Sequence, residues 1–323
     1  MRPRARSGGR PGRAVLVLSA ALLMTTCAPA EDLDALFEVA TSSPDLEARQ
    51  EAAEKIDNLV QSGDYRTIVR GIGSPNLFNR AQAIVLLGRM PQPEARKALR
   101  GLLAADQRMM LPFNPVRMKP DREPSDSRIL VATLIRRGGG DPEAAGTLLA
   151  GAEESQTAEA LVGLCYAIGA LRDPAALPFL DKASRHPDTP VVRAAVQALG
   201  QFPEPEVVEI LARLSTHPLL AVRSDVLSSV ATREDDATWA LLKSVGESDP
   251  SPEIRMSAYQ SLSRSKGADL VPYFIDCMKD ASGPARDVLA QNLSRLTGVS
   301  LGSKPEAWVR WWAKNRNDAR WSN

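Results

Sequence analysis

Histidine and cysteine carry much of the acid–base, nucleophilic and metal chemistry of proteins near neutral pH, and this chain has few of them. Its two histidines, His186 and His217, each stand directly before a proline, with no nucleophile motif and no acidic residue in a fixed pattern beside them. Cys165 and Cys277 lie in apolar stretches without a histidine or second cysteine at metal-ligand spacing. The sequence therefore predicts no catalytic residue, no metal site and no cofactor, and both cysteines are interpreted as buried thiols.

A repeat of about 31 residues organises the elements around these side chains. Four arginines, here called the arginine ladder, recur at intervals of 30, 32 and 31 residues: Arg193, Arg223, Arg255 and Arg286. An apolar residue follows each after six or seven positions: Leu199, Val230, Leu262 and Leu293. Apolar residues three or four apart then predict a helix, a turn and a second helix per unit, and we find no sustained alternation with period two. The expected fold is all-α, a superhelix of about seven to eight helix pairs.

Two stretches of this repeat resemble a known family. The opening from Asp249 to Arg255 and the run from Val192 to Gly200 resemble HEAT repeats, in the bacterial variety often called PBS-lyase HEAT-like. The resemblance covers most of residues 44–300, strongly after about residue 156 and loosely before, departs from the pattern around 104–125, and restarts at Arg128. The repeat solenoid is expected over residues 31–300. It implies a curved right-handed superhelix whose second helices line a concave face, usually a docking surface for another protein.

The arginine ladder has a structural and a functional interpretation. Asp249 and Asp280 stand six residues before Arg255 and Arg286, so the guanidinium groups can bridge to turn carboxylates or carbonyls within a unit or in the next one. The alternative is a row of cations offered to an acidic ligand. We favour the structural role, because stacked repeats need specific contacts between units.

The segment 105–127 interrupts the repeat and is rich in proline. It is expected to be an irregular loop, and loops longer than about 12 to 15 residues are usually functional or disordered. Its Met109, Met110, Leu111 and Phe113 are adaptable apolar groups that either cover an edge of the solenoid or grip a partner. These four residues are the candidate partner-binding loop.

The C-terminal segment 301–323 is rich in tryptophan. Trp308 and either Trp311 or Trp312 fall on one face of a helix by their spacing. The favoured interpretation is a capping helix that seals the last repeat; the alternative is an aromatic platform for a glycan or peptide. Trp321 lies outside this face and is not explained by it.

Residues 1–26 have the layout of a secretory signal, with five arginines, a short apolar stretch and then small residues. Cys27 follows Leu-Met-Thr-Thr, which resembles a bacterial lipobox, whose cysteine would be diacylated and become the mature N-terminus. A competing cleavage site lies after Ala30 and would release a soluble periplasmic or secreted protein. The lipid anchor is the expectation, since Cys27 otherwise has no evident use.

The net charge and the expected export of the chain together limit its possible functions. Removing residues 1–26 takes away five arginines and no acidic residue, which lowers the net charge from +1 to −4. A mildly acidic, exported chain is a poor candidate for nucleic-acid binding. We therefore expect a non-catalytic scaffold or adaptor of the bacterial cell envelope that binds a protein partner and no small-molecule substrate. A wall-polymer or glycan module is the alternative, and an unrecognised enzyme is a weaker one.

Overall fold

The computed structural model describes residues 32–104, 108–114, 119–154, 157–264 and 269–318, and within them it contains 17 α-helices. The even-numbered helices are α2 (Leu46–Ser62), α4 (Leu77–Arg89), α6 (Ser127–Arg137), α8 (Ala158–Leu171), α10 (Thr189–Leu199), α12 (Leu220–Val230), α14 (Pro252–Leu262) and α16 (Gly283–Thr297). The odd-numbered helices are α1 (Leu33–Ser42), α3 (Tyr65–Gly71), α5 (Pro93–Gly101), α7 (Ala144–Glu154), α9 (Leu177–Ala183), α11 (Glu206–Leu214), α13 (Asp236–Ser248), α15 (Leu270–Asp280) and α17 (Pro305–Asn315). A short 3₁₀ turn, Pro174–Ala176, precedes α9. The expected all-α superhelix of stacked helix pairs is confirmed.

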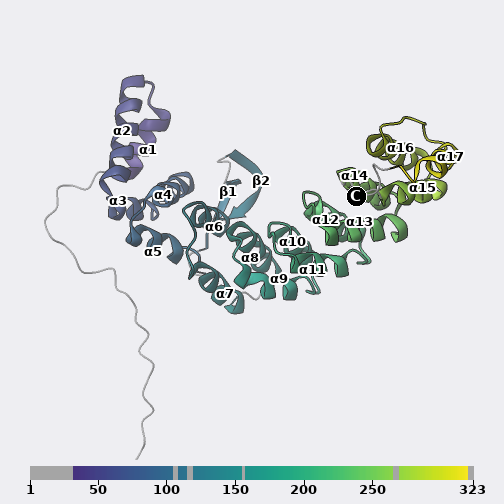
Figure 1. Cartoon of the computed structure of the whole chain (residues 1–323). Coiled ribbons are helices and arrows are strands. Elements are labelled where there is room, and N and C mark those ends of the chain that lie inside the picture. The colour runs from purple at the N-terminus through teal and green to yellow at the C-terminus, as the bar shows by residue number, and fades with distance from the viewer. Residues whose placement is uncertain (1–31, 105–107, 115–118, 155–156, 265–268, 319–323) are drawn as a thin grey trace, which may run out of the picture.

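The helices form an open arc of two layers (Figure 1). Helices α4, α6, α8, α10, α12 and α14 lie on the inner, concave side, and their partners α5, α7, α9, α11 and α13 lie outside. The ladder arginines belong to the inner helices, which are the first helices of their units. The expectation that second helices line the concave face is therefore wrong for this chain.

Close packing of the inner helices explains the direction of the curve. A Cβ atom built on Gly169 of α8 would lie 2.9 Å from the Cα of Ala198 in α10, and one built on Gly200 would lie 2.7 Å from the Cβ of Ser229 in α12. These glycines let successive first helices approach more closely than larger side chains would allow. A layer with shorter spacing becomes the inside of the arc.

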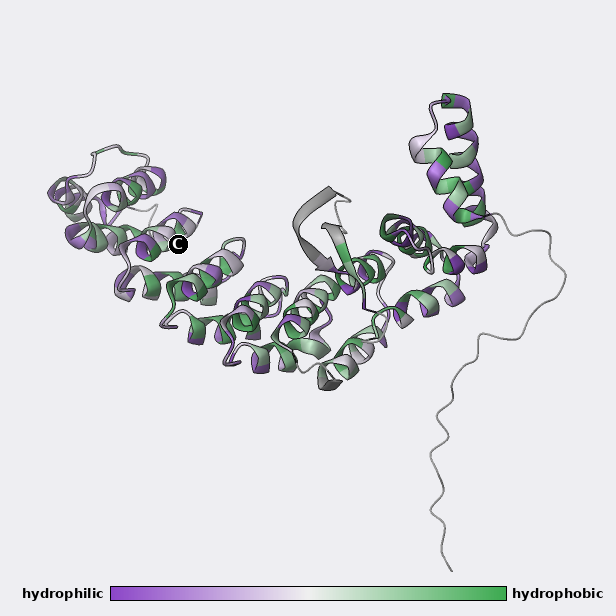
Figure 2. Cartoon of the chain, turned by 180° about the vertical axis from the view of Figure 1, so that it is seen from behind, coloured by the Kyte–Doolittle hydropathy of each residue, from purple (hydrophilic) through white to green (hydrophobic). Residues whose placement is uncertain are grey.

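The core runs between the two layers along the whole solenoid. The apolar residues that follow the ladder arginines, including Leu199, Val230, Leu262 and Leu293, are fully buried. Hydrophobic and hydrophilic residues share each helix in stripes (Figure 2), as expected when a helix buries one face against its neighbours. Each unit therefore depends on the next for its core, and almost all buried apolar residues of the described ranges form one continuous cluster.

The segment 105–127 differs from the irregular loop that the sequence predicts. Strands β1 (Met110–Asn114) and β2 (Lys119–Asp126) form an antiparallel hairpin, with Met110 opposite Asp126 and Asn114 opposite Lys119. The register shifts between Leu111 and Phe113, where extra residues of β2 bulge. Prolines hide the strand signal, because they break the alternating pattern and remove backbone donors. The hairpin rises from α6 on the concave side of the arc (Figure 1).

Candidate functional site on the concave face

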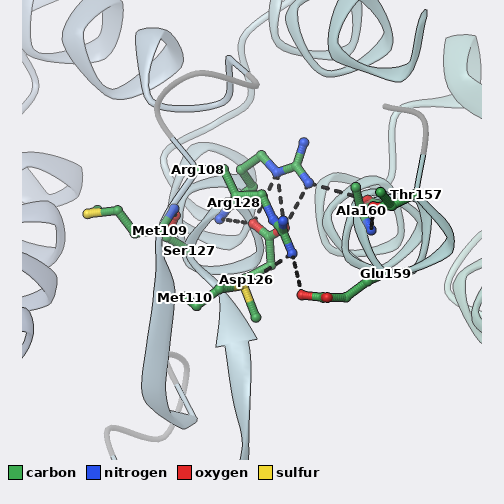
Figure 3. Close-up of polar contacts among 9 residues, drawn as sticks. All are labelled: Arg108, Met109, Met110, Asp126, Ser127, Arg128, Thr157, Glu159 and Ala160. Carbon is green, nitrogen blue, oxygen red and sulfur yellow. Dashed lines mark hydrogen bonds and ion pairs between the residues drawn. The ribbon is translucent and has the colours of Figure 1, made fainter. Parts of the chain in front are cut away.

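A buried carboxylate fixes the base of the hairpin. Asp126 ends β2 and caps α6, and its side chain is 2% exposed (Figure 3). It accepts hydrogen bonds from the backbone N–H of Arg128 (2.9 Å), from Nε and Nη2 of Arg128 (3.0 and 2.7 Å), and from Nε of Arg108 (2.8 Å). One side chain thus joins the strand, the helix and the residue that leads into β1.

The charges around Asp126 keep it ionised. Burial alone would raise its pKa, but the hydrogen bonds and positive charges of Arg128 and Arg108 outweigh that effect and lower it. Arg128 is itself 1% exposed, and its Nη2 also donates to the backbone oxygen of Ala160 in α8 at 3.5 Å. Arg108 continues outward to the exposed Glu159 at 3.2 Å. The hairpin is therefore clamped to both α6 and α8.

The four residues of the candidate partner-binding loop do not share one environment. Leu111 is fully buried in the core, and Met109 is half-buried with its sulfur 3.6 Å from Nη1 of Arg80 in α4. Met110 is 37% exposed, and Phe113 lies in β1, where only the backbone is described. Leu111 and Met109 thus contribute to covering the solenoid, whereas Met110 is available at the surface.

A polar chain continues along the concave face beyond the hairpin. The hydroxyl of Tyr166 in α8 donates to Gln197 Oε1 in α10 (3.2 Å), and Gln197 Nε2 approaches Asp225 Oδ1 in α12 (3.5 Å). Arg193 donates to both oxygens of Asp225 at 2.6 and 3.3 Å and remains 44% exposed. Three successive inner helices therefore carry hydrogen-bonding groups that a partner can reach.

The ladder arginines make contacts of three kinds. Arg193 forms an ion pair with Asp225 of the next unit and remains partly exposed. Arg223 is buried and binds Asp249 through two nitrogens at 2.7 and 3.1 Å, while its third nitrogen contacts the carbonyl of His217 at 2.9 Å. Arg255 donates to the backbone carbonyl of Asp249 at 2.6 Å. Turn carboxylates and carbonyls are thus the observed partners of Arg223 and Arg255, whereas Asp225, the partner of Arg193, lies within α12.

Arg286 at the end of the ladder and Arg49, which lies outside it, differ from these three. The Nε atoms of Arg286 and of Arg49 are buried without a hydrogen-bond partner among the described residues. Arg49 lies in α2, 31 residues before Arg80 of α4. The repeat spacing was the signal in the sequence that could have identified it. Asp126 was not predicted as a site residue either. Its place directly before α6, where aspartate often caps a helix, was the signal in the sequence that could have identified it.

The C-terminal tryptophans lie on α17, which packs against α15. Trp308 is fully buried and donates its indole N–H to the carbonyl of Gly302 at 2.7 Å. Trp311 packs edge-on against Trp308 with ring centroids 6.2 Å apart, and Trp312 stacks on Trp311 at 6.3 Å. A fully buried Trp308 cannot present its ring to a glycan. Trp321 lies outside the described residues.

The residues first considered for chemistry have structural partners. His186 and His217 each accept, through Nδ1, the backbone N–H two residues ahead at 3.1 Å, so both cap turns. Cys165 and Cys277 are free thiols, and burial raises the pKa of Cys165 to about 12. Within the described ranges no three His, Cys, Asp or Glu side chains are grouped as a metal site would need. No helix of those ranges has the length and apolar character to cross a membrane.

Comparison with protein families adds one assignment. Residues 145–231 match the family of HEAT repeats. This stretch spans α7 to α12, the part of the solenoid that carries Arg193 and Arg223. Comparison with curated proteins gives no match.

Several solved structures are distantly similar. Human deoxyhypusine hydroxylase in complex with glycerol is 16% identical, with 84% of this chain and 97% of that chain covered and a TM-score of 0.34. The Escherichia coli protein YibA is 14% identical over 82% and 92% of the two chains, with a TM-score of 0.40. An engineered protein is 19% identical over 89% and 85%, with a TM-score of 0.37. The arc described above rests on this chain's own helices.

Proposed function

We propose that this repeat protein is a non-catalytic scaffold or adaptor of the bacterial cell envelope that binds a protein partner on its concave face. The observation that carries the proposal is the hairpin clamped upright in the concavity by Asp126 and Arg128. A rigid projection in a preformed curve limits which partners fit and lowers the entropy lost on binding.

The hairpin and its neighbours suit a partner that binds through side-chain contacts better than one that adds a third strand to the hairpin. Pro112, Pro120 and Pro124 lie within the two strands and lack backbone donors, which disfavours pairing of a third strand at either edge. Exposed Met110 and the hydrogen-bonding row from Tyr166 to Asp225 supply adaptable apolar and polar contacts on the same side of the arc. A helical or extended segment that crosses the inner helices would meet both.

The envelope location follows from the leader and Cys27, which lie outside the described residues. A lipid chain on Cys27 would hold the solenoid at a membrane surface, while cleavage after Ala30 would leave it soluble. Replacing Cys27 by Ser tests the anchor: the variant should lose incorporation of labelled fatty acid and move from the membrane fraction to the soluble fraction. Unchanged labelling and fractionation would refute it.

The partner is tested by cross-linking in membrane preparations, followed by mass spectrometry. Replacing residues 112–124 by a short glycine–serine link should remove one dominant protein neighbour while thermal unfolding stays unchanged. A matched pair within one unit sharpens the result: Arg193→Glu on the concave face should weaken the cross-link, whereas Glu209→Lys on the outer helix should leave it intact.

Three outcomes would contradict this function. If the variant that lacks residues 112–124 and Arg193→Glu both keep the same cross-linked neighbour, the binding site lies outside the concave face. Enrichment of the native protein on wall material without a protein neighbour would favour the polymer-binding alternative. A small-molecule turnover that survives purification would make the chain an enzyme.

A further inference from the structure

The first five helices, residues 32–104 and here called the N-terminal arm, hold two blocks of opposite charge. Residues 32–64 contain nine acidic and two basic residues, a net charge of −7. Residues 65–104 contain seven basic residues and one acidic residue, a net charge of +6. The arm is therefore a charge dipole whose blocks nearly cancel. By contrast, residues 141–318 carry 24 acidic and 18 basic residues, mixed along the chain.

Asp57 of the acidic block pairs with Arg89 of the basic block at 3.2 Å, but each block also keeps two exposed charges without an ion pair. Glu38 in α1 and Glu54 in α2 are exposed and make no ion pair within the described residues. The same holds for Arg96 and Lys97 on α5. Exposed charges of one sign repel one another, and that repulsion is relieved when a surface of opposite charge covers them.

Exposed apolar side chains accompany these charges. Leu46 at the start of α2 is 60% exposed, Val39 in α1 is 38% exposed, and Phe78 in α4 is 36% exposed. Each lies within the N-terminal arm. Apolar residues that stay exposed beside complementary charges are typical of protein interfaces, where the former provide affinity and the latter orientation.

We propose that the N-terminal arm is the interface of a two-fold homodimer, in which the acidic block of each copy faces the basic block of the other. Two dipoles that lie side by side attract each other when they are antiparallel, and a two-fold axis perpendicular to them produces that arrangement. It brings one self-complementary surface against itself, the rule for the commonest protein dimers. The concave faces remain open, so the dimer presents two partner sites.

The test is the molar mass of residues 28–323, which omit only the predicted leader and its cysteine, measured by sedimentation across a range of protein concentrations. At about 0.1 M salt, where charges are screened over about 10 Å, the mass should be twice that of the monomer. At about 1 M salt the screening length falls to about 3 Å, and the dissociation constant of the dimer should rise at least about tenfold. A monomer at low salt would overturn the proposal.

Charge reversal identifies the surfaces. Glu38→Lys with Glu54→Lys should give monomers, and so should Arg96→Glu with Lys97→Glu, because each variant leaves like charges facing one another. All four substitutions together restore opposite charges and should restore the dimer. Failure of this rescue, with each protein still folded by circular dichroism, would overturn the pairing of the two blocks.

Matched controls separate this interface from general charge effects. Glu209→Lys with Glu247→Lys makes the same charge change outside the arm and should leave the dimer intact. Leu46→Asp should weaken the dimer, while Leu220→Asp, at a side chain that is 45% exposed, should not. A monomeric wild-type protein that sediments with anionic lipid vesicles would instead assign the basic block to a membrane.

Discussion

Neighbouring rungs of the arginine ladder behave differently although their sequences look alike. Arg223 and Asp249 form a closed rung with side chains 9% and 2% exposed, beside a cleft of about 230 Å³. At the next rung Arg255 meets no carboxylate within the described residues, and the adjacent cleft measures about 720 Å³. The repeat signature alone does not show whether a rung is closed.

The difference comes from where one helix ends. Helix α13 ends at Ser248, so Asp249 follows it in extended backbone and turns inward. Helix α15 includes Asp280 as its last residue, and this carboxylate stays exposed. Both aspartates stand two residues before the serine that caps the next inner helix. One additional helical residue therefore changes a buried ion pair into an open cleft.

The strongest way to break the comparison is Arg223→Met. It leaves Asp249 buried without its partner, and we expect a loss of about 3 to 5 kcal/mol in the free energy of unfolding. Arg193→Met, at the exposed rung, should lose only about 0.2 to 1 kcal/mol. Urea denaturation of both variants measures the contrast, and equal losses would refute the distinction between buried and exposed rungs.

Acidification tests the buried pair at the base of the hairpin. Because the pKa of Asp126 is lowered on folding, its contribution is present above the pKa of the unfolded carboxyl, about 4, and is lost as the pH falls through the folded value. The free energy of unfolding should therefore fall more steeply below about pH 4 in the wild type than in Asp126→Asn. Parallel pH profiles would show that Asp126 is not held ionised.

Arg255→Met examines the open rung. Because Arg255 has no ion pair to lose, the free energy of unfolding of the variant should lie within about 1 kcal/mol of the wild-type value. Calorimetry measures this, and cross-linking of envelope partners provides the second readout. A loss comparable to that of Arg223→Met would make Arg255 an essential structural rung, whereas normal stability with a lost partner would place binding at the cleft.

The smallest expected effect is in thiol reactivity. Cys277 is half-buried beside the open cleft, whereas Cys165 is fully buried with a pKa of about 12. Labelling with a thiol reagent at pH 8 should modify Cys277 roughly tenfold faster or more. Cys165→Ser and Cys277→Ser identify the two rates, and faster labelling of Cys165 would show that the core opens.

The periodic part of this protein can be read from the amino-acid order alone, because burial of one helical face repeats about every 31 residues and leaves a visible pattern. The ladder spacing and the apolar register that ends at Leu293 are read in this way. Which helices lie inside the arc depends on packing between units, since Gly169 and Gly200 set the spacing of the inner helices. The tertiary structure also revealed the proline-rich hairpin and the clamp at Asp126, which depend on contacts between segments that no local pattern records.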